Sequence, residues 1–160
     1  MDGRVRAAEA GDIAAIEAIW NRIIDETTVT FTTERRRLEG WLAAKDAAGE
    51  PVLVWDAGGC QGFATYGPFR AGPGYAHLAE HTVMLAEDAR GSGAGRALMS
   101  ALAEIARARG KAALIGGISG ENAAALAFHV ALGFAEVGRV PGAGRKFGRS
   151  LDLVLMHREL

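Results

Sequence analysis

Apolar residues recur at helical spacing in four stretches of this 160-residue chain, and each stretch predicts an amphipathic helix. The first helix follows Gly11, and Asp12 is its expected N-cap. The second is expected over residues 34–47, the third ends before Gly110, and the fourth covers about 122–132. The side chains expected to face the core are Ile13, Ile16, Ile19, Trp20, Ile23 and Ile24 in the first helix, Leu38, Trp41 and Leu42 in the second, and Leu98, Met99, Leu102 and Ile105 in the third.

Shorter runs of aliphatic, aromatic and β-branched residues predict strands. They are expected at 4–8, 51–55, 62–69, 81–85, 112–118, 134–140 and 151–156, with a hairpin turn at 56–59, a partly extended loop at 27–33 and a turn-rich segment at 141–149. The strands come first and then alternate with helices. This order predicts an α/β protein in which helices flank one mixed central sheet.

A glycine-rich turn separates the strand at 81–85 from the third helix. It consists of Arg90, Gly91, Ser92, Gly93, Ala94, Gly95 and Arg96. Glycine lets backbone N–H groups approach a ligand closely, and the helix N-terminus behind the turn adds free donors and partial positive charge. The turn is therefore expected to bind a phosphate or pyrophosphate, although a flexible connector of similar composition is the competing interpretation.

Spacing separates the possible phosphate-binding motifs. A Walker loop ends in Gly-Lys-Ser/Thr, whereas this turn ends in Gly95-Arg96-Ala97. A dinucleotide fingerprint needs G-x-G-x-x-G in an early βαβ unit and an acid about 20 residues later, but Ala112 and Leu114 lie in that region. Neither nucleotide hydrolysis nor dinucleotide binding is therefore expected.

Composition and charge restrict the kinds of partner and site that the protein is expected to have. The formal net charge of −1 gives no general attraction to nucleic acid or anionic lipid, and no apolar run has the length of a membrane span. The N-terminus lacks the layout of a signal peptide. The single cysteine, Cys60, excludes an internal disulfide and a cysteine-based metal cluster, and no metal site is expected. A cytoplasmic protein with a small-molecule partner is expected.

The turn fits the pattern Arg/Gln-x-x-Gly-x-Gly/Ala through Arg90, Gly93 and Gly95. At these residues the chain resembles the GNAT N-acetyltransferases, and the segment from Asn122 to Phe134 resembles the family's Asn, short helix and closing Gly-Phe. The resemblance implies the GNAT fold over essentially the whole chain and acetyl-CoA as co-substrate. It implies that the cofactor contacts the glycine-rich turn, the strand residues Val83, Met84 and Leu85, and Asn122, for which a helix N-cap is the simpler role.

Four segments resemble the phosphinothricin and methionine sulfoximine acetyltransferase group within that family. They are Thr27-Thr28-Val29-Thr30-Phe31-Thr32, Glu80-His81-Thr82-Val83-Met84-Leu85, His129 to Phe134, and Gly144-Arg145-Lys146-Phe147-Gly148-Arg149. The resemblance implies a small amino acid or toxic analogue as acceptor and a homodimer. The group usually has Trp where this chain has Ser150, which implies a different or bulkier acceptor than phosphinothricin.

Acetyl transfer to an amine needs a base, a polarised carbonyl and a proton for the leaving thiolate. Glu80 is the expected base, because its apolar neighbours favour a raised pKa; an ordinary exposed glutamate is the alternative. The resemblance implies that His129 is the acid, with a capped helix residue as the alternative, and that backbone N–H groups near Val83 and Leu85 are free to polarise the carbonyl. His81 is expected to point away from Glu80, so that the two form no dyad.

The acceptor pocket is expected to involve Phe31, Tyr66 and Tyr75, each of which also fits a core role. Lys146 and Arg149 are candidate anchors for an acceptor carboxylate or phosphinate, against solvated loop charges. The leading function is direct acetyl transfer from acetyl-CoA in a ternary complex. A protein N-terminus or another amine as acceptor, and a non-catalytic acyl-CoA sensor, are the alternatives.

Overall fold

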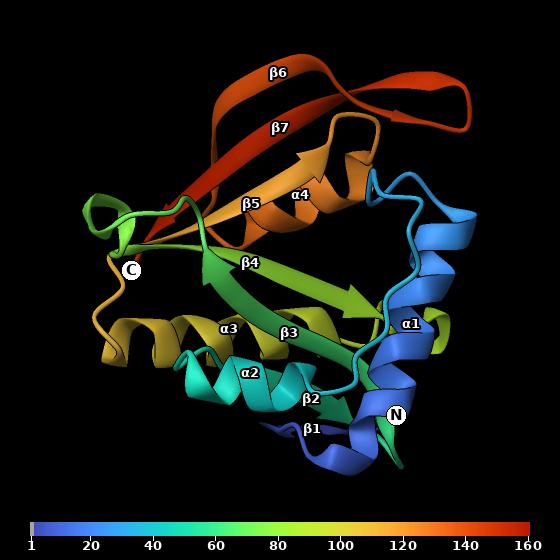
Figure 1. The fold of residues 1–160 in the computed structure, drawn as a ribbon, viewed down its shortest axis with the longest axis vertical. Coiled ribbons are helices and arrows are strands. Elements are labelled where there is room, and N and C mark those ends of the chain that lie inside the picture. The colour runs from blue at the N-terminus through green and yellow to red at the C-terminus, as the bar shows by residue number, and fades with distance from the viewer. Residues whose placement is uncertain (1) are drawn as a thin grey trace.

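Seven strands form one mixed sheet in the order β1-β2-β3-β4-β5-β7-β6 in the computed structural model, which describes residues 2–160 (Figure 1). All neighbouring strands are antiparallel except β4 and β5, which run parallel. The strands are β1 (Arg4–Ala7), β2 (Val52–Asp56), β3 (Cys60–Pro68), β4 (Leu78–Leu85), β5 (Ala113–Ser119), β6 (Ala135–Lys146) and β7 (Arg149–Glu159). The helices are α1 (Ile13–Glu26), α2 (Trp41–Ala47), α3 (Ala94–Ala108) and α4 (Ala123–Ala131), with short 3₁₀ turns η1 (Ala10–Asp12), η2 (Pro73–Tyr75) and η3 (Glu87–Ala89).

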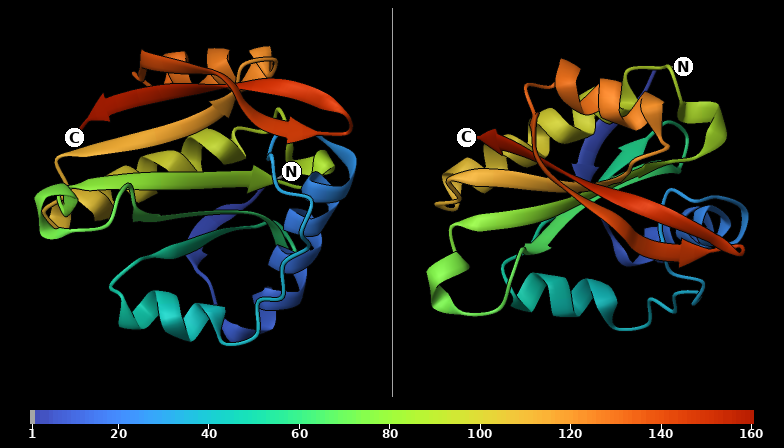
Figure 2. Two further views of the ribbon diagram at one scale, coloured as in Figure 1. Left: turned by 45° about the horizontal axis from the view of Figure 1, so that its top comes forward. Right: turned by 90° about the horizontal axis from the view of Figure 1, so that it is seen from above.

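Helices cover both faces of the sheet, α1 and α2 on one side and α3 and α4 on the other (Figure 2). The apolar face of α1 packs with Leu38, Val52, Val54, Phe63 and Met84, and α2 adds Trp41 and Leu42 to this core. On the opposite face, α3 and α4 pack against the alternate residues of the same strands, among them Leu53, Ala64 and Tyr66. The expected α/β architecture is confirmed. None of the helices within residues 2–160 is long and apolar enough to cross a membrane.

The second helix is shorter than the expected 34–47, because α2 begins only at Trp41. Gly40 precedes it with φ 71°, a left-handed conformation that interrupts helical geometry. Upstream, Asn21 on α1 donates to the carbonyl of Arg36 and accepts its N–H at 3.0 and 2.7 Å, and Glu17 accepts the N–H of Leu38 at 2.8 Å. The segment therefore satisfies its backbone with side chains of α1 instead of forming its own helix.

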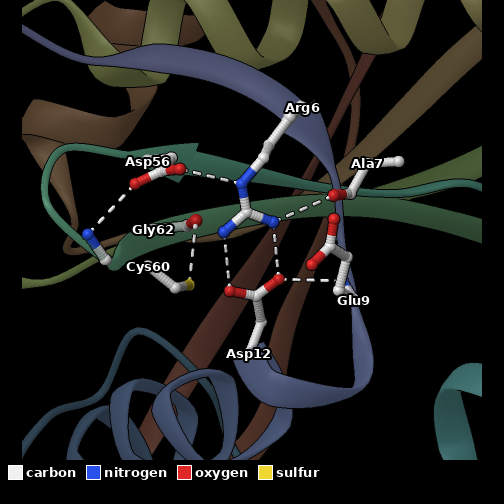
Figure 3. Close-up of polar contacts among 8 residues, drawn as sticks. Arg6, Ala7, Glu9, Asp12, Asp56, Cys60 and Gly62 are labelled. Atoms are coloured by element: carbon white, nitrogen blue, oxygen red, sulfur yellow. Dashed lines mark hydrogen bonds and ion pairs between the residues drawn. The ribbon is translucent and has the colours of Figure 1, made fainter.

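Asp12 has a different role from the expected N-cap of α1. Its carboxylate accepts two hydrogen bonds from Arg6, at 2.7 and 2.9 Å, and the Glu9 N–H at 2.8 Å, and it makes no capping bond to α1 (Figure 3). Arg6 also donates to Asp56 on β2 at 2.9 Å. These bonds lower the pKa values of both aspartates. The cluster joins β1, β2 and the start of α1.

The C-terminal hairpin is longer than the sequence indicates. The residues expected to be a turn-rich segment continue β6 as far as Lys146, and the reversal occurs at Phe147 and Gly148, whose φ values are 52° and 71°. Pairing with β7 shifts between Val140 and Gly144, which accommodates Pro141. A proline is tolerated because β6 is the edge strand and its outer N–H groups need no partner in the sheet.

Candidate active site

β4 and β5 pair over only three residues and then separate. Residues 78–80 of β4 lie beside residues 113–115 of β5, whereas the remainder of each strand, to Leu85 and Ser119, has no partner on that side. Figure 1 shows the two arrows diverging towards α1. A cavity of about 400 Å³ occupies this gap.

The cavity passes from one face of the sheet to the other. Neighbouring side chains of a strand point to opposite faces, yet all six residues from Glu80 to Leu85 line it. Met84 belongs to the core on the α1 face, while Val83 and Leu85 pack with the core on the α3 and α4 face. Lining residues on the α1 side are Ile23, Val29 and Thr30, and those from the other side include Arg90, Gly95, Asn122, Ala124, Ala125, Phe128 and His129.

Backbone N–H groups of β4 point into this gap. Ala86 donates to the Gln61 carbonyl at 2.8 Å, so residues 61 and 86 form a hydrogen-bonded pair of the antiparallel β3–β4 ladder. Such pairs alternate with non-hydrogen-bonded pairs, which here are Gly62 with Leu85 and Ala64 with Val83. The N–H groups of Val83 and Leu85 therefore point away from β3, towards the cavity where β5 has diverged.

Glu80 stands at the point where β4 and β5 separate. Its side chain is open to the cavity, and a Cβ on Gly117 of β5 would lie 3.5 Å from its Oε1. The walls desolvate the carboxylate, and this burial raises the pKa of Glu80 above its ordinary value. A carboxylate that is accessible and has a raised pKa is suited to accept a proton at neutral pH.

His81 faces the opposite side from Glu80, as expected, and forms a pair that sequence reasoning missed. Its Nε2 lies 2.9 Å from Nε2 of His129, and His129 Nδ1 lies 2.7 Å from the Ala125 carbonyl. A carbonyl only accepts, so His129 carries its proton on Nδ1, and His81 donates from Nε2 to the bare Nε2 of His129. Burial, together with the neighbouring His129, lowers the pKa of His81 to about 3, and burial lowers the pKa of His129.

This geometry does not support the expected role of His129 as a proton donor. At neutral pH the ring is neutral, its only N–H is bonded to the Ala125 carbonyl, and its other nitrogen accepts from His81. The ring lines the cavity but has no N–H free to donate into it. His129 and His81 instead form a fixed part of the cavity wall, packed against Phe134 with ring centroids 5.2 Å from each.

The glycine-rich turn has the backbone that the sequence predicts. Gly91 and Gly93 have φ values of 72° and 87°, and α3 begins directly afterwards at Ala94. The Ser92 hydroxyl is bonded to the Ala89 carbonyl at 2.6 Å, which fixes the turn. Ala97 makes the first bond of the helix, to the carbonyl of Gly93, and the Ala94 N–H donates to the Ser92 hydroxyl at 3.4 Å, so the N–H groups of Gly95 and Arg96 remain for a ligand.

Other predicted cofactor-binding positions cluster around this turn. Gly95 packs closely under Phe128 of α4, where a Cβ would lie 3.1 Å from the ring. Asn122 lines the cavity and also caps α4, where its side chain accepts the Ala125 N–H at 3.1 Å. Its capping role is therefore compatible with a contact to the cofactor. Arg90 lines the cavity, whereas Arg96 is exposed on α3 and is not among the lining residues.

Two aromatic residues expected in the acceptor pocket lie elsewhere. Tyr66 is 2% exposed in the core on the α3 face, because β3 directs it away from α1. Tyr75 is in η2 and packs edge-on against Phe69, with ring centroids 6.5 Å apart. Neither residue lines the cavity, and both predictions are corrected.

Phe31, Lys146 and Arg149 lie on the α1 side of the cavity without lining it. Lys146 is 3% exposed and donates to the Thr30 carbonyl at 2.9 Å. Arg149 makes a bidentate pair with Glu121, at 2.6 and 3.0 Å. Their polar groups are thus engaged within the protein instead of facing the cavity as free anchors.

The cavity residues that the sequence analysis missed are small or apolar. Gly116 and Gly117 are the clearest, since a Cβ on Gly116 would lie 2.8 Å from His81 Cε1. Two glycines inside an apolar strand are a sequence signal of close approach that could have indicated this site. Ser119 carries no comparable signal. Val29 and Thr30 belong to the 27–32 segment whose resemblance to the acetyltransferase group indicated the substrate site, although only Phe31 of that segment was predicted to be a site residue. No group of three or more His, Cys, Asp or Glu side chains in the described part of the chain could hold a metal ion.

Proteins that are similar in sequence to this chain align with it over nearly its whole length. The L-amino acid N-acyltransferase MnaT of Escherichia coli (strain K12) is 38% identical over 160 residues, covering 98% of this chain and 93% of that protein. The L-methionine sulfoximine/L-methionine sulfone acetyltransferase of Pseudomonas paraeruginosa (strain DSM 24068 / PA7) is 36% identical over 165 residues, covering 100% and 96%.

Solved structures of acetyltransferases have the same fold as this chain over nearly its whole length. The yncA acetyltransferase of Salmonella typhimurium, solved with its cofactor acetyl-CoA, has a TM-score of 0.95 at 34% identity, covering 100% of this chain and 95% of that one. A ribosomal-protein-alanine N-acetyltransferase from Brucella melitensis has a TM-score of 0.94 at 41% identity, covering 98% and 99%. The model of the Acetyltransferase (GNAT) family matches residues 16–134. With its divided sheet, glycine-rich turn and open cavity, the chain belongs to the GNAT family of acetyltransferases.

Proposed function

We propose that this enzyme transfers the acetyl group of acetyl-CoA to the amine of a small L-amino acid or an analogue such as methionine sulfoximine or methionine sulfone. The cavity through the sheet is the observation that carries the proposal. The glycine-rich turn and α4 border it on one face, and Glu80 borders it on the other. Two substrates can therefore approach from opposite faces and meet in the gap, which supports direct transfer without a covalent enzyme intermediate.

The α3 side is suited to acetyl-CoA. Free N–H groups at the start of α3, the left-handed glycines of the turn and Arg90 together favour a pyrophosphate. The N–H groups of Val83 and Leu85 lie deeper in the gap, where they can bond the thioester carbonyl and the oxyanion that forms during attack. A relative of known structure binds acetyl-CoA.

Glu80 is the proposed base. The ammonium form of the acceptor passes a proton to the Glu80 carboxylate, directly or through a water, and the neutral amine then attacks the carbonyl carbon of the thioester. The C–N bond forms and the C–S bond breaks. The nitrogen loses its second proton to the departing CoA thiolate, so that CoA leaves as the thiol, and Glu80 releases the first proton to solvent. The backbone N–H groups of Val83 and Leu85 are held in place by the β3–β4 ladder, so they stabilise the oxyanion without rearranging.

The names of the curated relatives support an amino-acid acceptor, since one acts on L-amino acids and another on L-methionine sulfoximine and L-methionine sulfone. A protein N-terminus is the second candidate. It is favoured by the similarity to the ribosomal-protein-alanine enzyme, which is 41% identical. A free amino acid and a protein N-terminus differ in size, so a panel of amines distinguishes between the two candidate acceptors.

The test measures release of free CoA thiol across a panel that holds methionine sulfoximine, methionine sulfone, phosphinothricin, the common amino acids and short peptides with N-terminal alanine. We expect turnover with the sulfoximine or the sulfone. Glu80→Gln is expected to lower kcat by about 10²- to 10⁴-fold with acetyl-CoA binding retained, while the exposed control Glu39→Gln stays at wild-type rate. Turnover confined to the peptides would transfer the proposal to the second candidate, and full activity in Glu80→Gln would exclude Glu80 as the base.

We also propose that the protein is a homodimer. Four of the six large hydrophobic side chains exposed within residues 2–160 belong to α4, to β6 or to the turn after it, namely Val130, Val137, Val140 and Phe147. Exposed apolar residues distributed along the edge strand β6 and on the helix before it support an interface along this edge of the sheet. Light scattering coupled to size-exclusion chromatography tests it, and a monomer mass at micromolar concentration would contradict it.

A further inference from the structure

The segment formed by residues 27–33 borders the α1 side of the cavity without secondary structure of its own. Val29 and Thr30 line the cavity, opposite the glycine-rich turn. Among residues 2–160, Thr27 alone in this segment donates a backbone–backbone bond, to the Ile23 carbonyl at 3.2 Å. Within the segment the Thr27 hydroxyl accepts the Val29 N–H at 3.2 Å and donates to the Ile23 carbonyl at 2.6 Å. Beyond Val29, the hydrogen bond that holds its backbone comes from a side chain elsewhere in the fold.

Lys146, near the end of β6, is the most buried of these side chains. It is 3% exposed, its ammonium donates to the Thr30 carbonyl at 2.9 Å, and it belongs to none of the ion pairs found in residues 2–160. A buried ammonium without an ion-pair partner is costly; here the Asp25 carboxylate acts on it from beyond ion-pair distance, and the Phe147 ring lies 5.1 Å from the ammonium. Among the described residues, the Thr30 carbonyl is its hydrogen-bond acceptor, so the ammonium fixes the position of that carbonyl.

A second connection runs through Glu121, in the turn between β5 and α4. Its carboxylate pairs with Arg149 of β7 through two bonds and accepts the Thr28 hydroxyl. Glu121 precedes Asn122, which lines the cavity. The network thus joins one end of the 27–33 segment to β7 and to the rim of the cavity.

Phe31 makes a third connection, by packing. Its ring lies against the backbone of Gly144 on β6, so close that a Cβ there would be 2.3 Å from Phe31 Cδ2. The absence of a side chain at Gly144 is what permits this contact. All three connections start in the 27–33 segment. Two lead to the end of the β6–β7 hairpin, and the third leads to Glu121, which pairs with Arg149 of that hairpin.

We propose that Lys146 and the Arg149–Glu121 pair act as positioning residues, which hold Val29 and Thr30 as the wall against which the acceptor amine fits, and so set acceptor preference without touching the acceptor. This inference rests on the proposed acetyltransferase function. It replaces direct anchoring of an acceptor anion, because the groups that would bind the anion are already engaged with Thr30 and Glu121.

The experiment compares Lys146→Met and Arg149→Gln with the matched control Arg145→Gln, an exposed arginine of the same hairpin. Hydrogen exchange of peptides covering 27–33 and steady-state kinetics are measured for each, with an amino-acid acceptor and with its uncharged carboxamide. We expect faster exchange in this segment for the first two variants and an acceptor KM about tenfold higher. The Kd for acetyl-CoA is expected to stay within about twofold, with equal losses for acid and carboxamide, because the mechanism is geometric. Arg149→Lys keeps an ion pair and is expected to recover part of the loss.

Two results would overturn the inference. One is unchanged exchange in residues 27–33 in both variants. The other is a loss confined to the carboxylate acceptor, which would make Lys146 or Arg149 a direct anchor. Absence of turnover in the wild-type protein would count against the proposed function alone, because the exchange measurement judges the positioning role independently.

Discussion

Replacing Gly116 by alanine tests the arrangement of the His81–His129 pair. The new Cβ would lie 2.8 Å from His81 Cε1, 3.3 Å from its Nε2 and 3.6 Å from His129 Cδ2. The His81 ring cannot move aside easily, because it is 6% exposed, bonded to His129 at 2.9 Å and packed on Phe134. The substitution therefore forces either an overpacked wall or a broken hydrogen bond.

The magnitude follows from three effects when overpacking and loss of the hydrogen bond occur together. Overpacking a core costs about 1–3 kcal/mol, and a lost hydrogen bond about 0.5–1.5 kcal/mol. Alanine regains about 0.5–1 kcal/mol relative to glycine in a strand, because the unfolded chain loses less freedom. The middle of these ranges leaves a net destabilisation of about 2 kcal/mol, which corresponds to a fall in Tm of about 4–8 °C for a domain of this size.

Thermal unfolding followed by circular dichroism measures the effect. Gly138→Ala is the matched control, since Gly138 also lies in a strand and a Cβ there would meet no atom within 4 Å. Its Tm is expected to stay level or rise. In the Gly116→Ala background His81→Ala should cost less than in the wild type, because removing the His81 ring also relieves its overlap with the new Cβ. A Tm for Gly116→Ala equal to that of the control would refute the reasoning.

Three further predictions concern the site and the Arg6 cluster. Because burial raises the pKa of Glu80 and a base must be deprotonated, the acidic limb of kcat/KM is expected above the range of an ordinary glutamate; a limb at the ordinary value would contradict the assignment. Arg90→Ala is expected to raise the Kd for acetyl-CoA about tenfold by calorimetry, whereas Arg107→Ala, at the far end of α3, should leave it unchanged. Asp12→Asn is expected to lower stability in urea by about 1.5–3 kcal/mol at neutral pH. The Arg6 bonds lower the pKa of Asp12, so this stability is present above the unfolded pKa and is lost as pH falls through the folded one; a deficit that persists in acid would argue against the ion pair.

Local patterns predicted most of the fold. The apolar spacing of α1 and α3, the β2–β3 hairpin and the Asn122 cap of α4 all depend on neighbouring residues, and all appear as expected. The extended second helix was wrong because Asn21 and Glu17, far away in sequence, compete for its backbone groups. The long β6 strand was missed because its irregular register is set by pairing with β7.

The candidate site was predictable where one segment builds it. The glycine-rich turn follows from a strand, a turn and a helix in succession. The free Val83 and Leu85 amides depend on the divergence of β5, which is distant in sequence, and only the family resemblance indicated them. The His81–His129 bond joins residues 48 positions apart, and no spacing rule indicates it. Tyr66 shows the limit of composition, since an aromatic residue on β3 suits a pocket or a core and the face of the sheet decides between them.

The short β4–β5 pairing has a consequence for the mechanics of the molecule. Strands β1 to β4 and strands β5 to β7 form two half-sheets that share only three paired positions on each side of their common seam. A ligand that forms hydrogen bonds with the free edge of β4 and also contacts α4 would couple the two half-sheets across that seam. Saturation with acetyl-CoA at 100 times its Kd adds about 2.7 kcal/mol to the folded state. The slowing of hydrogen exchange that acetyl-CoA causes should therefore extend to strands on both sides of the seam.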